Sequence, residues 1–418
     1  MKMQWKKWSI MVITASCIAA LLCWYFSIRR SVDEDFRLPE DTKVILAFQT
    51  FSKDYVPDPF SRSELFFLNQ QGQQLKHIRI KDDIWGDYLV SNSGNICMFC
   101  HNESVIINKG RPIKFSDYDE KATITYNLYG PSIVGYINDL ELYYAVRNNA
   151  GGPEYASTIR FVADDGSISY DVFLPYYIDE VCYVPDKKVL LCDIWPFEDT
   201  PLTYIELKYD ETLDRFVFDG ELLELKNDFL LDESSIYGLL VKENFLYHLT
   251  LIWNEQEGTY SPVLSKYDLN TGNCVLNQAV CDSYSQGGYG GGGILVGSAD
   301  LPTTTRNGKL YFFASDGNVY IIEDEDHIAV RPMPYTFKSA VPVSAPLTSR
   351  LSANRNFSDA IVQVGNDGEI YILIVFGNRK VRIFRLEDEG EYSVFWEGTL
   401  PPGLMPDLDI NDFEIVTY

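Results

Sequence analysis

The most recognisable chemical spacing in the chain is C-x-x-C-H, formed by Cys97, Cys100 and His101. This spacing is the attachment signature of c-type haem, so a haem-bearing electron carrier is one hypothesis. The surrounding stretch, GNICMFCHNES (94–104), favours a strand instead. Residues three apart in a strand lie on opposite faces and about 10 Å apart, so these thiols could not hold one haem edge. Haem c is therefore kept as an alternative to a buried strand.

The other cysteines are consistent with core residues. Aligned strand by strand, Cys100, Cys192 and His248 occupy one position of a recurring apolar run. Free cysteine behaves as a small buried hydrophobe, which suits such a position. Cys182 and Cys192 also flank the hairpin-like YVPDKKVLL, so a disulfide between them is a candidate in an oxidising compartment.

Two acidic turns are candidates for a cation site. Asp268 and Asn270, in DLNTGN (268–273), alternate before a glycine as in a Ca²⁺ loop, but the distal acid is absent. The stretch IIEDEDHIAV (321–330) gathers four acids and a histidine. Solvated hairpin turns account for both stretches as well. We therefore expect no cofactor, and keep calcium and haem c as alternatives.

Aromatic residues cluster with acids or glycines in several segments that could face a ligand. LPYYIDE (174–180), DIWPFED (193–199) and LIWNEQEGTY (251–260) combine rings with carboxylates, which suits sugar or peptide surfaces. The glycine-rich SQGGYGGGGILVG (285–297) lacks the helix and the Lys-Ser/Thr ending of a phosphate loop. The candidate ligand-facing residues are Trp195, Trp253, Tyr284 and Tyr289.

No assembled catalytic motif occurs in the chain. Only 4 histidines are present, and neither a G-x-S-x-G elbow nor an H-E-x-x-H zinc motif is found. The 60 acidic residues nevertheless leave a carboxylate pair open, because such pairs form in three dimensions. An enzyme acting on carbohydrate or peptide is therefore kept as an alternative to a binding protein.

The elements that must position these residues follow from a repeated phrase. An apolar, aromatic-rich run, a glycine turn and a second such run recur in segments such as TIRFVADDGSISYDVFL (158–174) and KLYFFASDGNVYIIED (309–324). Asp-Gly and Asn-Gly between apolar runs are strong hairpin signals. The repeat recurs every ~40–50 residues, the signature of a β-propeller with four strands per blade. Seven blades fit residues 43–418, with six or eight also open, and two stacked β-sandwiches are the rival fold.

The turn phrases YDLNTGNCVL (267–276) and YFFASDGNVYIIE (311–323) resemble repeats of the quinoprotein and WD40-like propeller superfamily. The resemblance covers most of residues 43–400, but only in the arrangement of strands and turns. The Trp-Asp dipeptide of WD40 repeats is absent, and 7 tryptophans are too few for tryptophan-docking quinoprotein blades. The resemblance therefore implies a propeller and implies little about function.

The N-terminus predicts a membrane anchor. No charged residue lies between Lys7 and Arg29, and positions 9–28 are mostly apolar, enough to span a ~30 Å hydrocarbon core. No A-x-A cleavage site follows, so an uncleaved anchor is favoured over a cleaved or lipidated N-terminus. Lysines before this segment and acids after it predict a cytoplasmic N-terminus and an extracytoplasmic body. Residues 1–30 would form the anchor and 31–42 a linker.

The sequence as a whole predicts an all-β, seven-bladed propeller behind an N-terminal transmembrane helix. The net charge of −25 argues against nucleic acid, which needs clustered Lys and Arg, and favours basic partners. Membrane lipid would be contacted through the N-terminal helix. The predicted function is a membrane-anchored, extracytoplasmic binding or scaffold module for a protein or glycan partner.

Overall fold

The structure is a computed structural model. It describes residue 16 and residues 38–50, 63–80, 84–92, 94–100, 103–107, 112–116, 128–149, 156–194, 203–226, 235–254, 259–281, 284–285, 303–313, 318–332, 360–365, 367–375, 380–387, 392–399 and 408–416. Within these residues no helix is long and apolar enough to cross a membrane. The predicted anchor (1–30), apart from residue 16, and most of the predicted linker (31–42) lie outside the described part of the chain.

The described strands form seven sheets, each with a path of four strands. We number the sheets as blades in chain order. Blade 1 contains β29 (Leu408–Ile415), β1 (Val44–Thr50), β2 (Ser63–Leu68) and β3 (Gln74–Ile80). Blade 2 contains β4 (Ile84–Asn92), β5 (Asn95–Cys100), β6 (Glu103–Ile107) and β7 (Pro112–Ser116). Blade 3 contains β8 (Leu128–Ile137), β9 (Leu142–Asn149), β10 (Ala156–Ala163) and β11 (Ser169–Leu174).

Blades 4 to 7 repeat this order. Blade 4 contains β12 (Ile178–Val184), β13 (Val189–Ile194), β14 (Thr203–Asp210) and β15 (Arg215–Glu224), with the short 3-10 helix η1 (Pro185–Lys187) after β12. Blade 5 contains β16 (Ser235–Lys242), β17 (Phe245–Asn254), β18 (Thr259–Asp268) and β19 (Cys274–Ala279), and β20 (Tyr284–Ser285) pairs with β18. Blade 6 contains β21 (Thr303–Arg306), β22 (Lys309–Phe313), β23 (Asn318–Ile322) and β24 (Ile328–Pro332). Blade 7 contains β25 (Ala360–Val364), β26 (Ile370–Val375), β27 (Lys380–Leu386) and β28 (Tyr392–Thr399).

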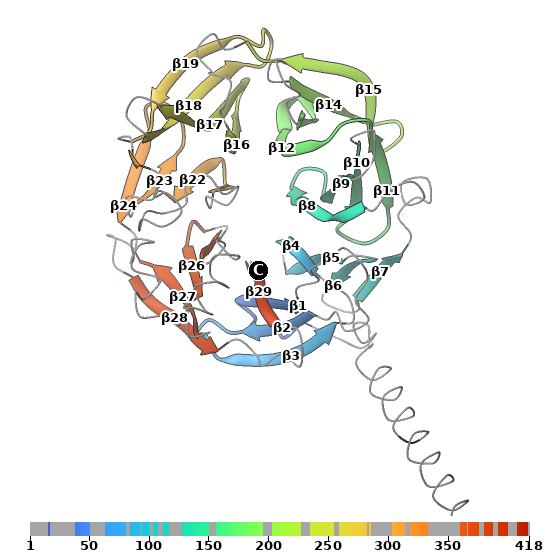
Figure 1. Ribbon diagram of the computed structural model, residues 1–418. Helices are drawn as coiled ribbons and strands as arrows, with labels where there is room; N and C mark the ends of the chain where they lie inside the picture. Colours follow the sequence, from blue (N-terminus) through green and yellow to red (C-terminus); the bar gives the residue numbers. More distant parts are fainter. Residues whose placement is uncertain are drawn as a thin grey trace, which may run out of the picture.

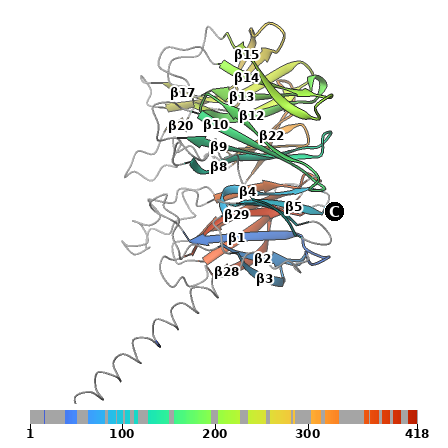
Figure 2. The same ribbon diagram turned by 90° about the vertical axis from the view of Figure 1, so that its right-hand side faces the viewer.

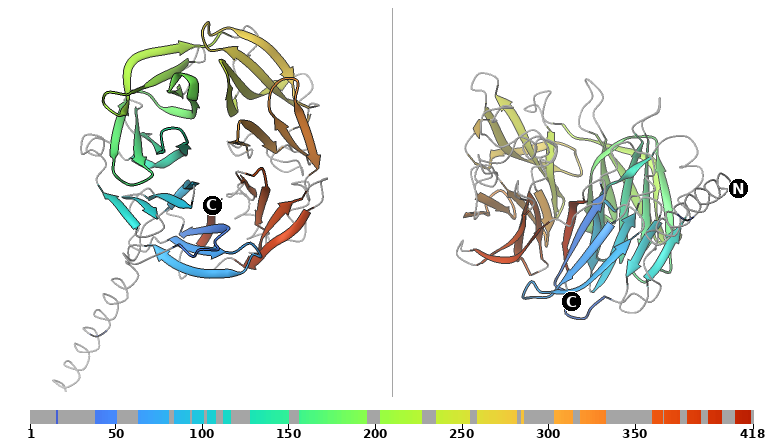
Figure 3. Two further views of the ribbon diagram at one scale, coloured as in Figure 1. Left: turned by 180° about the vertical axis from the view of Figure 1, so that it is seen from behind. Right: turned by 60° about the horizontal axis from the view of Figure 1, so that its bottom comes forward.

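The sheets are arranged in a ring around one axis (Figure 1). The first strands of the sheets contact one another in the circular order β4, β8, β12, β16, β21, β25 and β29. The view from behind shows the same order (Figure 3). The prediction of an all-β propeller is therefore confirmed, and two stacked β-sandwiches are excluded.

The two ends of the described propeller close the ring. β29, from the end of the chain, pairs antiparallel with β1 and becomes the innermost strand of blade 1. The edge-on view shows these two strands side by side (Figure 2). Val44, Leu46 and Ile415 are almost fully buried where they meet. Because this pairing joins distant segments, the ring holds together as one unit.

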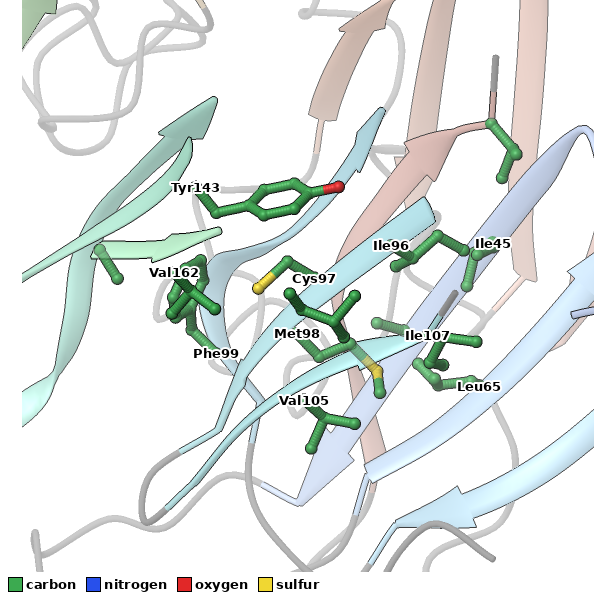
Figure 4. Close-up of a cluster of buried hydrophobic side chains, with 14 of the residues drawn as sticks. Ile45, Leu65, Ile96, Cys97, Met98, Phe99, Val105, Ile107, Tyr143 and Val162 are labelled. Atoms are coloured by element: carbon green, nitrogen blue, oxygen red, sulfur yellow. The ribbon is translucent and has the colours of Figure 1, made fainter. Parts of the chain in front are cut away.

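The hydrophobic core lies between neighbouring blades. Cys97 of β5 points toward Tyr143 of β9 and Val162 of β10, whereas Met98 points to the side of Leu65 of β2 (Figure 4). Cys192 of β13 is equally buried between blades 3 and 4. The strand alternation explains this arrangement, because successive residues of a propeller strand face the preceding and the following blade.

Two acidic turns bind their blades to a neighbouring blade. The Asp164 carboxylate, in the turn before β11, accepts hydrogen bonds from the Tyr143 hydroxyl at 2.7 Å and from Asn95 of blade 2 at 2.8 Å. The Glu325 carboxylate of blade 6 contacts Lys266 and the Tyr247 hydroxyl of blade 5, each at 2.5 Å. These contacts give the recurring acidic turns a structural role.

Candidate functional site

A bulge in the innermost strand of blade 4 gathers three carboxyl groups. Ile178 pairs with Ile194 and Val181 pairs with Cys192, so Asp179 and Glu180 together oppose the single residue Asp193. A bulge of this kind re-aims side chains at the rim of a sheet. Asp179 and Glu180 are half-buried on the strand nearest the axis, whereas Asp193 is fully buried.

Burial makes these carboxyl groups reluctant to ionise. Removal from water raises the pKa of Asp179 above its usual value. The pKa of Asp193 is raised further, first by burial and then by the neighbouring charges of Asp179 and Glu180. Among the described residues, neither oxygen of Asp193 has a hydrogen-bond partner in the protein. A hydrogen-bond donor delivered to Asp193 would offset the cost of its burial.

Tyr204 of β14 lies directly opposite Asp193 in the sheet. Its side chain is fully buried, and burial together with the Asp193 carboxyl raises the pKa of its hydroxyl. That hydroxyl has no hydrogen-bond partner among the described residues. Tyr204 packs on the side of blade 4 that faces blade 5, with Leu246 and Tyr267.

Blade 3 fixes the position of the bulge. The Asn148 amide donates to the backbone carbonyl of Ile178 at 2.6 Å, and the Ser157 hydroxyl donates to the carbonyl of Tyr176 at 2.7 Å. The backbone N–H of Ile178 donates in return to the Asn148 amide oxygen at 3.2 Å and the Ser157 hydroxyl at 3.1 Å. Both side chains are buried, so the start of β12 is held rigidly just before Asp179.

The C-x-x-C-H segment forms part of a strand, as expected. Cys97 and Cys100 both lie in β5, whose residues pair with β4 and β6. Cys97 is a fully buried free thiol, and burial raises its pKa well above the usual value. His101 and the side chain of Cys100 lie outside the described residues. The position of Cys97 in the core therefore lends no support to the haem alternative.

The proposed alignment of Cys100 with Cys192 and His248 is wrong by two residues. The position before the bulge is occupied by Cys100 opposite Ile84 and by Ile194 opposite Ile178. Cys100 therefore corresponds to Ile194, two positions beyond Cys192.

The proposed disulfide between Cys182 and Cys192 is also wrong, because both thiols are free. Cys182 pairs with Leu191 and Cys192 pairs with Val181, so the two cysteines are offset by one position. Neighbouring positions of a strand point to opposite faces of the sheet. The turn sets this offset, because Val184 pairs with Val189 and the register is regular from there to Val181 and Cys192.

The turns proposed for a cation are closed by the protein's own groups. The Asp268 carboxylate accepts the backbone N–H of Asn270 at 2.8 Å, and the Asn270 side-chain oxygen accepts the Lys187 ammonium at 3.3 Å. In the second acidic turn, Asp324 pairs with Lys242 at 2.7 Å. Among the described residues, no three His, Cys, Asp or Glu side chains converge as a metal site.

The predicted ligand-facing aromatic residues are only partly placed. Trp253 lies in β17 opposite Tyr260, and Tyr284 lies in β20 opposite the same residue. The backbones of Trp253 and Tyr284 are described, but their side chains are not. Trp195 and Tyr289 lie outside the described residues. Sequence reasoning did not single out Asp179 or Asp193, although LPYYIDE and DIWPFED contain them. Only the bulge reveals that these segments meet.

Comparison with known proteins finds only distant structural likeness. No protein-family model matches the chain, and no curated protein matches it. A mutant of the Synechocystis apocarotenoid oxygenase is 9% identical, covers 87% of this chain and 92% of its own, and has a TM-score of 0.44. Dihydro-haem d1 dehydrogenase NirN is 7% identical over 87% of this chain and 76% of its own, with a TM-score of 0.40.

A third solved structure extends the same likeness. Prolyl oligopeptidase B from Galerina marginata is 10% identical over 90% of this chain and 52% of its own, with a TM-score of 0.40. All three neighbours are named as enzymes of different classes. Likeness at this level carries no inference about activity.

Proposed function

We propose that this protein is a binding module that recognises a basic segment of a partner protein at the axial end of blade 4. The observation that carries the proposal is the β12 bulge, which sets Asp179 and Glu180 opposite the buried Asp193. The half-buried carboxyl groups of Asp179 and Glu180 attract a Lys or Arg side chain, because a cation offsets the repulsion between neighbouring carboxylates and the desolvation of Asp179. The net charge of −25 would steer such a partner toward the molecule.

The test is a calorimetric titration of the purified full chain with acetylated pentalysine amide. We expect saturable binding at pH 7 that weakens at least tenfold in Asp179→Asn. Asp186→Asn is the matched control, because Asp186 is an exposed acid on η1 of the same blade. Equal weakening by both variants would show diffuse attraction by net charge and would overturn the site. Binding of a neutral oligosaccharide in place of the peptide would identify a glycan partner and would also overturn it.

An enzymatic function is the second candidate, favoured by the half-buried Asp179, whose pKa burial raises above its usual value. A carboxylic acid with a raised pKa can act as a general acid on a glycosidic or peptide bond. We expect any hydrolysis of a polysaccharide or peptide panel to disappear in Asp179→Asn. Activity that survives this substitution would rule out Asp179 as the catalytic acid.

We further propose that the N-terminal segment tethers the propeller to a membrane, with the propeller outside the cytoplasm. The uncharged stretch between Lys7 and Arg29 supports this proposal. Alkaline carbonate should leave the full chain in the membrane pellet and release a chain lacking residues 1–30. Protease added to intact cells should digest the propeller. Release of the full chain by carbonate would contradict the tether.

A further inference from the structure

Three buried side chains share an unusual property. Asp193, Tyr204 and His248 are each at most 1% exposed. Among the described residues, none of their side-chain polar atoms has a hydrogen-bond partner in the protein. Buried polar groups are almost always paired, because an unpaired buried group destabilises the fold.

Other buried groups of the described chain differ from these three. A carboxylate oxygen of Glu64 contacts His77 at 3.0 Å. Arg160 forms a two-bond contact with Asp171. Full lack of pairing is therefore a property of Asp193, Tyr204 and His248, which makes their relative position informative.

All three side chains face the seam between blades 4 and 5. In blade 4, Leu191 packs against blade 5, and Asp193 is two positions further along the same strand face. Tyr204 opposes Asp193 and belongs to the same cluster. In blade 5, Leu246 packs against blade 4, and His248 is two positions further along. The His248 ring lies 6.1 Å from the ring of Tyr267, which packs in that seam.

The repeat places these groups at one height. Asp193 lies opposite the bulge of β12, and Leu249 lies at the corresponding bulge of β16, where Gly238 pairs with it. Asp193 in blade 4 therefore corresponds in position to Leu249 in blade 5. His248 precedes Leu249 and lies near the same height, on the blade 5 side of the seam. The three side chains approach one region from two neighbouring sheets.

The donors and acceptors in this region complement a bound hydroxyl group. A neutral imidazole offers one donor and one acceptor, and a phenol offers both as well. Burial lowers the pKa of His248 to about 3, so it is neutral at pH 7. Burial also raises the pKa of Asp193, which favours the protonated acid with a donor and an acceptor. Such a set suits a neutral guest better than an ion.

We infer that the seam between blades 4 and 5 binds a neutral hydroxyl-bearing guest that bridges Asp193, Tyr204 and His248. Ordered water and the hydroxyl groups of a small polyol share this chemistry. The inference is independent of the basic partner proposed for Asp179, because it concerns groups that are closed to a peptide.

The first test asks whether removing the Tyr204 hydroxyl raises or lowers the thermal unfolding midpoint. The Tyr204→Phe substitution removes only the hydroxyl. If that hydroxyl bonds a guest, the thermal unfolding midpoint should fall, as in Tyr371→Phe, whose hydroxyl donates to Glu369 at 3.0 Å. If the hydroxyl is bare, removing it should raise the midpoint, because an unpaired buried group is eliminated. A rise in Tyr204→Phe beside a fall in Tyr371→Phe would overturn the inference.

The second test identifies the guest. A crystal structure of the protein grown without polyols, followed by a glycerol soak, should show density within hydrogen-bond distance of Asp193 and His248. Water peaks unchanged by the soak would identify water, and their replacement by glycerol would identify a polyol site. A protein group from residues 195–202 in that place, or an anomalous metal peak, would contradict a hydroxyl guest.

Discussion

At the scale of single residues, His248 and Asp193 respond to burial in opposite ways. Burial lowers the pKa of the imidazole to about 3, and it raises the pKa of the carboxyl. In both cases burial favours the neutral form, so their charges do not compensate each other in the folded state. Their effects on stability therefore have opposite dependence on pH.

The sign for His248 follows from proton binding. Between its folded pKa and the unfolded value of about 6.5, only the unfolded chain binds the proton, so stability falls as the pH drops. For Asp193 the folded chain keeps a proton that the unfolded chain releases above about pH 3.9. Its contribution to stability therefore falls as the pH rises toward the folded pKa.

We predict that two substitutions separate these opposing slopes. Between pH 4.5 and 6.5, His248→Gln should shift the slope of unfolding free energy against pH by about −1.4 kcal/mol per pH unit relative to the natural chain. Asp193→Asn should shift this slope in the positive direction. Urea titrations at several pH values measure both slopes. If unfolding free energy depends on pH in the same way in all three proteins, the opposite contributions of His248 and Asp193 are refuted.

The residue scale also shows the limit of sequence reasoning. The buried thiols Cys97 and Cys192 were predictable, because their neighbours spell apolar strands. Asp179 and Asp193 were not, because a bulge is a property of two paired strands and leaves no mark in either strand alone. The Cys182–Cys192 disulfide is excluded by the register of the hairpin, which offsets the two cysteines by one position.

At the scale of elements, glycine turns set how closely the blades pack. Gly272, in the turn between β18 and β19, has a φ of 69°. A Cβ atom at this position would lie 2.3 Å from the backbone carbonyl oxygen of Glu224 in blade 4. The backbone carbonyl of Gly272 also accepts the N–H of Lys226 at 2.7 Å. This turn therefore packs against the neighbouring blade as well as reversing the chain.

We predict that Gly272→Ala destabilises the fold by more than the cost of positive φ alone. Gly308→Ala is the matched control, because Gly308 has a φ of 68° and an added Cβ would meet nothing within 4 Å. The control should lose about 1 kcal/mol of unfolding free energy, and Gly272→Ala should lose clearly more. Equal losses in urea unfolding would show that the turn does not need the close approach.

The element scale was largely readable from the sequence. The Asp-Gly and Asn-Gly turns correctly predicted hairpins, as at Gly166 and Gly368, which both have positive φ. The acidic turn at 321–326 was read as solvated, but Glu325 holds Lys266 and Tyr247 of blade 5. Contacts between blades depend on residues 59 to 78 positions apart, which local patterns do not record.

At the scale of the whole molecule, one strand pairing closes the propeller. β29 covers the buried edge of β1, including Val44, Leu46 and Phe48. Without β29 these apolar side chains would meet water, and blades 1 and 7 would lose their shared core around Ile415. The repeat in the sequence predicted blades, but it did not show which strand completes blade 1.

We predict that a chain ending at residue 407 loses cooperative unfolding. Exposed core at β1 should give a broad, low-temperature transition and rapid cleavage by protease. A chain ending at residue 416 keeps all of β29 and is the control. If the chain ending at 407 unfolds as sharply as the control, closure by β29 is not what holds the ring together.

The central claim is that a cation binds beside the Asp179 carboxyl at the β12 bulge. Because burial raises the pKa of that group, a bound cation should lower it again and expel a proton. Calorimetric titration of pentalysine at pH 5 in buffers of different ionisation enthalpy measures this release directly. The account predicts net proton release in the natural chain, reduced in Asp179→Asn and preserved in Asp186→Asn. Peptide binding without any proton release, or with equal release in Asp179→Asn, would contradict it.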